Sequence, residues 1–548
     1  MPGNDATTPV GWEQLSPAET RRGIRQAARE MGGLVRSTLG PLGVDKMVVR
    51  RMQDDTIRTF VSNDGVAILE EFEGETDHPI ANRFIALAED HEDALGDGTT
   101  TTTLLTSELL ATGIDLIEEG VPPTAVVEGF SIGAQRTLEV WDELAIPVAE
   151  SDRPTVRSAF DRARLERIAR GGMTNGRAGA WPLAGLAEDV VDAVLRVWEP
   201  RRGTVHLGYV AIETFPGGDV TDSELIPGTL LPYDPMTADD RLPVEGGVLL
   251  IDGDLQPREL RSGSVAIDGA RAGAVDEFDT ESARIAEAIA RSGVEAAFVT
   301  GDASAAIGDR LAERGVVTVR NVKRSDIDVL SRVTGATSRG PVTPNNPPLD
   351  AELGVGSVGW REATGGKRWL EVTAPAGSEP RSVGLVVRGG TESSAGEAER
   401  RIKDGLNAVR AAIKRPAALP GGGAADLAAA RAVRELAPKF DGREQLAVEG
   451  FAEAMEVVPR TLARNAGRDP IDSMTDLRVR HDAGRSRAGI DADGRLVDDV
   501  VAASDALNAH LVRTGGLIRG VEFANSLFTV DGVVFNDGPP VPFGDDGQ

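Results

Sequence analysis

Apolar residues recur at helical spacing along most of the first 146 residues. Leu110, Ile114 and Ile117 fall on one face of a predicted helix. Three further helices are predicted, over Thr20–Val35, Ala81–Ala94 and Ala125–Leu144. Between the first two of these, Val48–Val49 and Ile57–Val61 predict a short pair of strands. The start of the chain is therefore expected to be mainly helical.

The pattern changes between about residues 215 and 369. Short apolar runs at Val248–Ile251 and Ala297–Thr300 are followed at once by Gly and Asp, as buried strands often are. Helical spacing over 282–292 and 305–314 lies between and after these runs. This middle segment is therefore expected to be an α/β domain.

Helix returns in the last part of the chain. Helical spacing begins at Ser394 and dominates to about Phe523. Further elements are predicted as an Arg-rich, solvated helix between Arg157 and Arg170, a strand at Gly384–Val387, and terminal strands at Phe528–Val530 and Val533–Phe535. A chain of 548 residues is expected to form two to four domains. The simplest arrangement is one domain built from both chain ends, with another inserted between them.

Composition excludes several classes of function. The net charge of -28 makes nucleic acid an unfavourable partner, because such a surface repels phosphate. No cysteine is present, so disulfides, thiolate metal sites and cysteine nucleophiles are excluded. We expect no signal peptide and no membrane span, and hence a soluble cytoplasmic protein.

The acidic surface also predicts a salt requirement. Only six of the 59 basic residues are lysines, and acidic residues number 87. A cytosol at very high salt tolerates such a surface because screening suppresses self-repulsion. We therefore predict a halophilic source and unfolding at low salt. A melting temperature that does not change with salt concentration would contradict this prediction.

The segment Gly96–Thr103, with the sequence GDGTTTTT, is the strongest candidate for chemistry. It lies directly before the predicted helix, where glycines, hydroxyls and free N–H groups could hold phosphate oxygens. An aspartate there would repel bare phosphate, so a divalent cation between them is the natural interpretation, and a nucleotide–Mg²⁺ site is our first hypothesis. The alternative is a Gly-rich turn followed by an Asp or Thr helix cap.

Four other segments have both a structural and a functional interpretation. Thr38–Gly43 is either a helix stop or a second cradle for the nucleotide. Asn63-Asp64-Gly65 is first a hairpin signal, and alternatively places Asp64 as a carboxylate that orients or deprotonates water. Asp404 is either a surface residue of a helix or a second such carboxylate. Pro420–Ala424 is a plain loop or a close approach to a base or ribose.

These motifs occur in one order along the chain, with Arg388–Glu392 after Gly96–Thr103 and before Asp404. In this combination the chain resembles the group II chaperonins, which include the thermosome. The resemblance extends from about residue 18 to 535 and includes Gly217–Ile226 and Asp469–Asp472. It implies a multidomain α and α/β protein with the chaperonin fold. The implied domains are a mainly helical equatorial ATPase domain (1–147 and 405–548), a small α/β intermediate hinge domain (148–214 and 370–404) and an α/β apical substrate-binding domain (215–369) with a lid protrusion (260–281).

The resemblance also implies a function and its residues. The implied protein hydrolyses ATP with Mg²⁺, assembles with homologous or identical subunits into a double ring, and encloses unfolded polypeptides. Asp97 corresponds to the Mg²⁺ ligand, and Asp64 and Asp404 to the water-activating catalytic carboxylates. The implied ATP-binding residues are Thr38, Leu39, Gly40, Pro41, Gly65, Gly96, Gly98, Thr99, Thr100, Thr101, Arg177, Gly422, Gly423, Asp491 and Asn508.

This chain departs from the family pattern at several positions. Leu42 and Arg177 each stand where the family has Lys, Asp491 where it has Asn, and Asn508 where a Glu-Pro pair meets the nucleoside. The presumed protrusion is rich in Gly, Ala and Ser. An accessory or scaffolding paralogue with weak or no ATP turnover is therefore the alternative function. A small-molecule kinase is a third, for which no acceptor site is identified.

Overall fold

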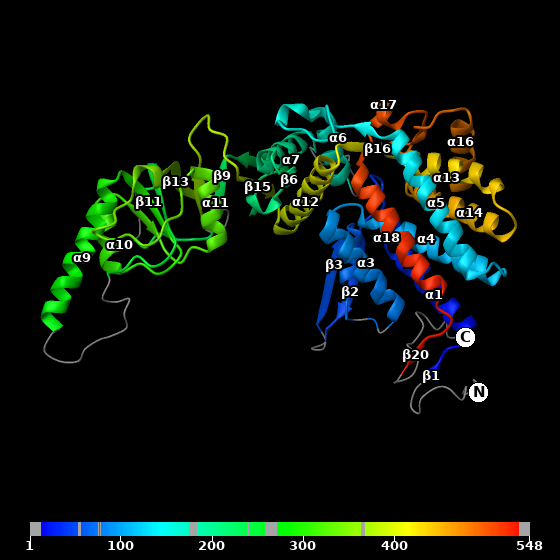
Figure 1. Cartoon of the computed structure of the whole chain (residues 1–548), viewed down its shortest axis with the longest axis horizontal. Coiled ribbons are helices and arrows are strands. Elements are labelled where there is room, and N and C mark those ends of the chain that lie inside the picture. Colours follow the sequence, from blue (N-terminus) through cyan, green and yellow to red (C-terminus); the bar gives the residue numbers. More distant parts are fainter. Residues whose placement is uncertain are drawn as a thin grey trace. The chain divides into compact units, whose positions relative to one another are not determined.

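The computed structural model describes residues 13–52, 56–74, 76, 78–174, 183–237, 241–257, 271–362 and 368–535. The chain divides into two compact units (Figure 1). The first unit consists of Met1–Val191, Pro200–Gly203 and Arg401–Gln548, and the second of Asp192–Glu199 and Thr204–Arg400. The first unit thus combines both ends of the chain.

The first unit is mainly helical. Its helices are α1 (Pro17–Arg36), α2 (Gly65–Glu70), α3 (Pro79–Leu95), α4 (Thr99–Glu118), α5 (Pro123–Leu144), α6 (Arg162–Met173), α13 (Ala424–Leu436), α14 (Arg443–Ala454), α15 (Val457–Asn465), α16 (Pro470–Asp482), α17 (Val500–Ser504) and α18 (His510–Phe528). Two helices pass from one unit to the other, α7 (Leu183–Val197) and α12 (Glu392–Lys414). The four helices predicted before residue 146 are confirmed as α1, α3, α4 and α5.

Short strands complete the first unit. They pair as β1 (Glu13–Gln14) with β20 (Val534–Phe535), β2 (Lys46–Arg51) with β3 (Ile57–Ser62), β16 (Ala417–Pro420) with both β4 (Ile146–Pro147) and β19 (Leu507–Ala509), and β17 (Gly489–Ile490) with β18 (Leu496–Val497). All these pairs are antiparallel. The predicted strand pair of Val48–Val49 with Ile57–Val61 is thus confirmed as β2 and β3.

The core of the first unit surrounds α4. This helix packs against α1 and α18, and Figure 1 shows α18 from the C-terminal part of the chain beside α4. Leu104, Leu109 and Leu110 are fully buried, and so is Phe130 of α5. Most residues of α4 are buried, including small hydroxyl-bearing ones such as Thr102, Thr103 and Thr106, so it is a central helix rather than a surface helix.

The strand predicted at Phe528–Val530 is wrong. The last helix continues to Phe528, whose ring is buried against Gly113 and lies edge-on to Phe130 at a centroid distance of 5.2 Å. Burial of this ring in the helical core stabilises helix over the local β preference. Of the predicted terminal strands, Val533–Phe535 is confirmed in part, as β20 (Val534–Phe535).

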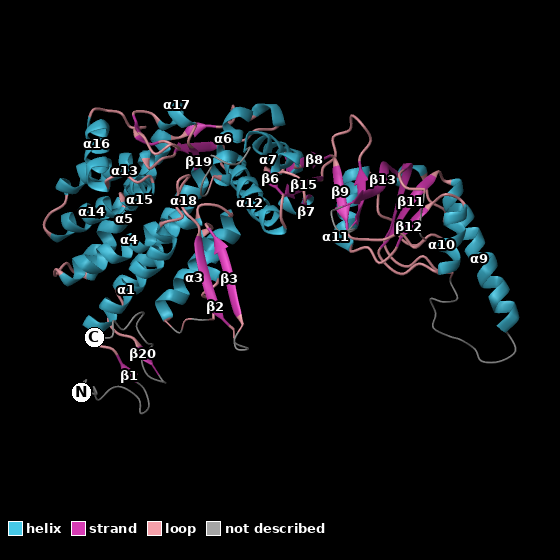
Figure 2. Ribbon diagram, turned by 180° about the vertical axis from the view of Figure 1, so that it is seen from behind, coloured by secondary structure: helices cyan, strands magenta, loops and turns pink. Residues whose placement is uncertain are grey.

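The second unit contains a six-stranded sheet in the order β12-β11-β10-β13-β14-β9 (Figure 2). Its strands are β9 (Gly228–Leu231), β10 (Val244–Ile251), β11 (Val294–Val299), β12 (Val317–Val319), β13 (Gly354–Glu362) and β14 (Arg368–Thr373). Helix α11 (Arg324–Thr334) packs on one face, and α9 (Arg271–Arg291) and α10 (Ala305–Glu313) pack on the other. Neighbouring residues Leu249 and Leu250 of β10 point to opposite cores, as strand geometry requires.

A smaller sheet in the second unit has the order β7-β15-β8. It consists of β7 (Val210–Pro216), β8 (Glu224–Ile226) and β15 (Val383–Gly389), with β15 parallel to β7 and antiparallel to β8. The α/β middle of the chain and the strand at Gly384–Val387 are thereby confirmed. The expected equatorial segments lie in the first unit and the expected apical segment in the second, while the expected intermediate segments are divided between them. The division into three domains stays a prediction.

Candidate functional site

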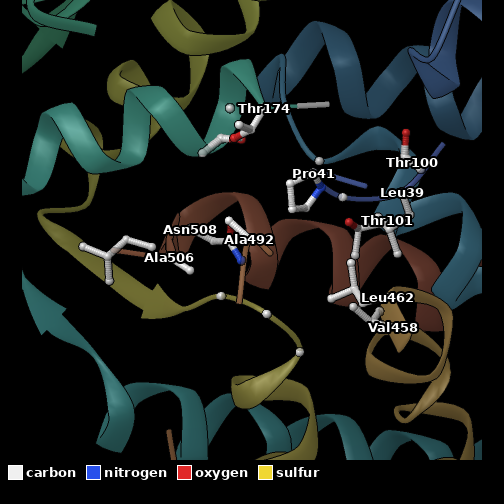
Figure 3. A pocket seen from close by; sticks show the side chains of 18 of the residues that line it. Leu39, Pro41, Thr100, Thr101, Thr174, Val458, Leu462, Ala492, Ala506 and Asn508 are labelled. Atoms are coloured by element: carbon white, nitrogen blue, oxygen red, sulfur yellow. The ribbon is translucent and has the colours of Figure 1, made fainter. Parts of the chain in front are cut away.

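A cavity of about 350 Å³ lies within the first unit. In Figure 3, Leu39, Pro41, Thr101 and Leu462 surround one part of it, and Ala492 and Asn508 lie at another. Residues far apart in the chain thus meet around one space.

The GDGTT segment forms one wall of this cavity. Helix α3 ends at Gly96 with φ 68°, and Gly98, with φ 81°, caps the start of α4. Both φ values lie in the left-handed region, which glycine adopts without strain. No side chain caps α4, so the interpretation of this segment as an Asp or Thr cap is wrong. The free N–H groups of the first helical turn are therefore left for a ligand.

Asp97 lies between the two glycines and borders the cavity. Protein surrounds its carboxyl group closely, and this burial raises its pKa to about 6, with the charge of Asp64 as a smaller contribution in the same direction. A hydrogen bond from the Gly98 N–H and the positive charge of Arg513 oppose the shift. A carboxylate that is costly to ionise here would be stabilised by a bound cation.

Arg513 is held next to Asp97 by a buried ion pair. Its guanidinium donates to Asp426, which is 3% exposed, and lies 5.4 Å from the centroid of the Trp141 ring. The pair places one positive charge near Asp97 without neutralising it. Breaking such a pair leaves an uncompensated buried charge, so both partners are structurally important.

Asp64 caps α2 and borders the same cavity. Its Oδ1 accepts the backbone N–H of Val66 at 3.1 Å. The hairpin interpretation of Asn63-Asp64-Gly65 is therefore wrong, because these residues lead from β3 into a helix rather than around a turn between strands. Its structural role is that of a helix cap, and its role as a water-orienting carboxylate stays a prediction.

Asp404 lies in the part of α12 that belongs to the first unit, and it also lines the cavity. Asp404 is half-buried at the cavity wall, and its catalytic role stays a prediction. Asp64, Asp97 and Asp404 come from three separate segments and border one space.

The remaining walls suit a nucleoside. Gly422 and Gly423 have φ values of 59° and 76° and lead into α13. Val458 and Leu462, one helical turn apart on α15, supply an apolar wall. Asp491 is 7% exposed, and its Oδ1 accepts the N–H groups of Asp493 and Arg495 at 3.0 and 2.7 Å.

Comparison with known proteins decides the family. A model of the TCP-1/cpn60 chaperonin family matches residues 32–537. The chain is 36% identical over 518 residues to thermosome subunit 1 of Haloferax volcanii, with 93% of this chain and 87% of that protein covered. It is 35% identical to thermosome subunit alpha of Halobacterium salinarum (93% and 87%) and 32% identical to the thermosome subunit of Methanopyrus kandleri (96% and 94%). The chain belongs to the TCP-1/cpn60 chaperonin family. It is a group II chaperonin subunit, and its activity is that of an ATP-dependent chaperonin.

The cavity brings together most of the site residues predicted for this chaperonin. Those that line it are Leu39, Gly40, Pro41, Asp64, Asp97, Gly98, Thr99, Thr100, Thr101, Asp404, Gly422, Gly423, Asp491 and Asn508. Their individual roles stay predictions. Arg177 lies outside the described residues.

Three predicted residues support the chaperonin cavity without lining it. The Thr38 hydroxyl donates to the Val35 carbonyl at 2.9 Å, so it closes the end of α1. A Cβ on Gly96 would lie 2.2 Å from the Asn407 side chain, and one on Gly65 would lie 2.5 Å from Thr100 Oγ1. These glycines therefore allow α12 and α2 to approach the GDGTT segment.

Some lining residues were not predicted from the sequence. They are Glu92, Arg167, Arg170, Asp426, Val458, Leu462, Asn465, Asp505 and Arg513, among others. Val458 and Leu462 are an apolar pair at helical spacing, which indicates a buried helix face but not that this face borders the cavity. The Asp426–Arg513 pair joins residues 87 positions apart, and nothing local indicates it.

The donor set suits Mg²⁺ held jointly with phosphates. Within the part of the chain that the structure describes, no three Asp, Glu or His side chains are grouped closely enough to bind a metal by themselves. Mg²⁺ is commonly bound through one or two carboxylates plus substrate phosphates and water, which Asp97 beside a helix N-terminus would permit. Among the described helices, none has both the length and the apolar character needed to cross a membrane.

Gly65→Ala is expected to lower the free energy of unfolding by about 1–3 kcal/mol and to weaken ATP binding, because its Cβ would collide with Thr100. Gly23→Ala is the matched control, since its Cβ meets nothing within 4 Å on α1 and should stabilise the helix by about 0.5–1 kcal/mol. Urea unfolding measures the change in stability of each variant, and ATP titration measures the change in its ATP binding. Equal effects of the two substitutions would contradict the close packing of α2 on α4.

Proposed function

We propose that this subunit encloses non-native polypeptides in a double-ring chamber and couples hydrolysis of ATP·Mg²⁺ to closure of a lid. The observation that carries the proposal is the meeting of Asp64, Asp97 and Asp404 in one cavity beside the start of α4. Three carboxylates around a cavity that a helix N-terminus also borders suit a cation and a polyphosphate together better than either alone.

Each part of the cavity has a proposed role. Asp97 would hold the Mg²⁺ ion, whose chemistry is to neutralise charge on the phosphate oxygens. The N–H groups of Thr99, Thr100 and Thr101, with the hydroxyls of Thr100 and Thr101, would hold the phosphates. Val458 and Leu462 would contact the base, and Gly422 and Gly423 leave space for the ribose.

Asp64 and Asp404 would orient and deprotonate the attacking water. Asp64 is fixed by its cap on α2, whereas α12, which carries Asp404, continues from the first compact unit into the second. Both carboxylates belong to the first unit, but a tilt of the continuous helix α12 with the second unit would displace Asp404 and not Asp64. This arrangement would couple hydrolysis to a change of shape.

The proposed domains follow the chain as predicted. Residues 1–147 and 405–548 would form the equatorial domain, 148–214 and 370–404 the intermediate domain, and 215–369 the apical domain. The proposed lid protrusion (260–281) lies partly outside the described residues. Its part from residue 271 onward belongs to α9. Unfolded polypeptides would bind the apical domain, in the cytoplasm.

An exposed apolar face supports assembly with other subunits. On the β2–β3 hairpin, Met47 pairs with Val61 and Arg51 with Ile57, so that Met47, Val49, Ile57 and Val61 share one face. These four side chains are 46–66% exposed. A lone two-stranded hairpin is marginally stable in water, and burial against another subunit would stabilise it.

Asn508 favours a second candidate function, an accessory subunit that binds nucleotide weakly and turns over little. It lines the cavity on β19 with a neutral carboxamide. Such a subunit would still form rings but would depend on partner subunits for hydrolysis.

Electron microscopy and ATP hydrolysis of the purified protein in high salt test the proposal. We expect rings, slow Mg²⁺-dependent turnover, and ATP-dependent protection of a denatured client from aggregation. Asp64→Ala and Asp404→Ala should abolish turnover and leave the rings intact. Normal turnover in both variants would refute the catalytic assignment, and rings that bind ATP without turnover in the wild type would favour the accessory subunit.

A further inference from the structure

Glu92 is an acidic residue of the cavity that the proposed mechanism does not use. It lies in the last turn of α3, partly buried, and lines the cavity with Asp97. The Thr99 hydroxyl donates a hydrogen bond of 2.8 Å to Glu92 Oε2. Because a hydroxyl has one proton, this bond fixes the direction of the two lone pairs on Thr99 Oγ1.

A second set of contacts connects the same region to the helix of Asp404. Asn407 lies directly over Gly96, where a Cβ would be 2.2 Å from its side chain. Arg410, one turn further along α12, carries the opposite charge to Glu92 and interacts with it electrostatically. Asp404, Asn407 and Arg410 follow one another at spacings of three residues and thus lie along one side of α12.

The electrostatics agree with this geometry. Burial raises the pKa of Glu92, with Asp97 and Glu70 adding to the rise and Thr99 and Arg410 opposing it. Burial also lowers the pKa of Arg410, and Glu92 opposes that shift. Each ionised side chain therefore favours the charged form of the other.

We propose that Glu92 is a positioning residue that takes the Thr99 hydroxyl proton in a hydrogen bond and so turns the oxygen lone pairs of Thr99 toward the nucleotide site. Its attraction to Arg410 adds to the packing of Asn407 on Gly96 that keeps the helix of Asp404 against the GDGTT segment. The inference rests on the proposed function. It assigns Glu92 an effect on the chemical step rather than on binding, since Glu92 acts through Thr99 and α12 and the ground-state contacts to the nucleotide come from other residues.

The ATP turnover of four variants tests the proposed effect of Glu92 on Thr99. Glu92→Gln keeps the size of the side chain and removes its charge, and should lower kcat about tenfold with the KM for ATP within twofold of the wild type. Thr99→Val should produce a similar loss. The double variant should lose little more than either single variant, because the two residues act as one unit. Asp93→Asn, an exposed neighbour on α3, is the control and should turn over at the wild-type rate.

Hydrogen exchange in the nucleotide-free ring tests the proposed effect of Glu92 on α12, and it needs no ATP hydrolysis. Glu92→Gln should raise exchange of the backbone over residues 401–414 several-fold, whereas Asp93→Asn should not. Unchanged exchange, a wild-type kcat in Glu92→Gln, or additive losses with Thr99→Val would each overturn the proposal. A wild type without turnover would instead refute the proposed function, so the two failures are distinguishable.

Discussion

Asp97→Asn is expected to reduce Mg²⁺-dependent ATP hydrolysis by at least about 100-fold, because it removes the one ligand that the chain offers the cation in the GDGTT segment. The same substitution is expected to stabilise the metal-free protein. Burial raises the pKa of Asp97 to about 6, so its ionised form costs free energy at pH 7. A shift of one unit corresponds to about 1.4 kcal/mol, and contact with water in the cavity reduces the total to about 1–2 kcal/mol.

The pH dependence of the free energy of unfolding distinguishes the loss of the Asp97 charge from a general change in stability. In the metal-free wild type, folded Asp97 takes up a proton at higher pH than the unfolded chain does, so stability rises as pH falls from about 6 toward about 4. Asp97→Asn should lack this rise, and the two proteins should converge at low pH. Urea unfolding in EDTA at several pH values measures the difference. Asp93→Asn, on the exposed surface of α3, is the control and should change neither turnover nor stability.

Glu456→Gln is expected to give a large loss of stability, about 3 kcal/mol. The Glu456 side chain is fully buried and accepts hydrogen bonds from Arg434 at 2.8 Å and from Arg478 Nε at 2.9 Å, with Arg460 at 3.5 Å. These residues tie α13, α15 and α16 together around one carboxylate. Removing the negative charge leaves three guanidinium groups close to one another without their shared partner.

The sign of the pH dependence is opposite to that at Asp97. Burial alone would raise the pKa of Glu456, but the hydrogen bonds and charges of Arg478 and Arg434 outweigh it and lower the pKa below its ordinary 4.5. The stabilisation is therefore complete above pH 4.5 and is lost as pH falls through the lower folded value. Glu435→Gln is the matched control, since Glu435 pairs with Arg431 while 61% exposed and should cost at most about 0.5 kcal/mol. Equal losses from the two substitutions would contradict the role of burial.

The segments that form the site could be predicted from the sequence because their signals are local. Gly96–Thr101 and Gly421–Gly423 combine glycines with a following helix, and both lie at the cavity. Asp64 and Asp404 were each ambiguous alone, and only the order of motifs along the chain favoured their functional interpretation. The structure places both on the wall of the cavity that Asp97 borders.

Other features depend on contacts between distant residues, and the sequence could not indicate them. Phe528 is helical because its ring is buried against Gly113 and Phe130, which no local pattern shows. The Asp426–Arg513 pair and the position of Arg410 near Glu92 likewise depend on how α3, α12, α13 and α18 pack. Such packing decides where a charge lies, whereas sequence spacing decides only which helix carries it.

A structure of the ring determined with Mg²⁺ and a non-hydrolysable ATP analogue tests the central claim most directly. We predict that the metal is bound to Asp97, that the terminal phosphate lies at the start of α4, and that Asp64 and Asp404 flank it on the side from which water attacks. Triphosphate density elsewhere, or Asp404 turned away from that phosphate in every ring state, would contradict the account.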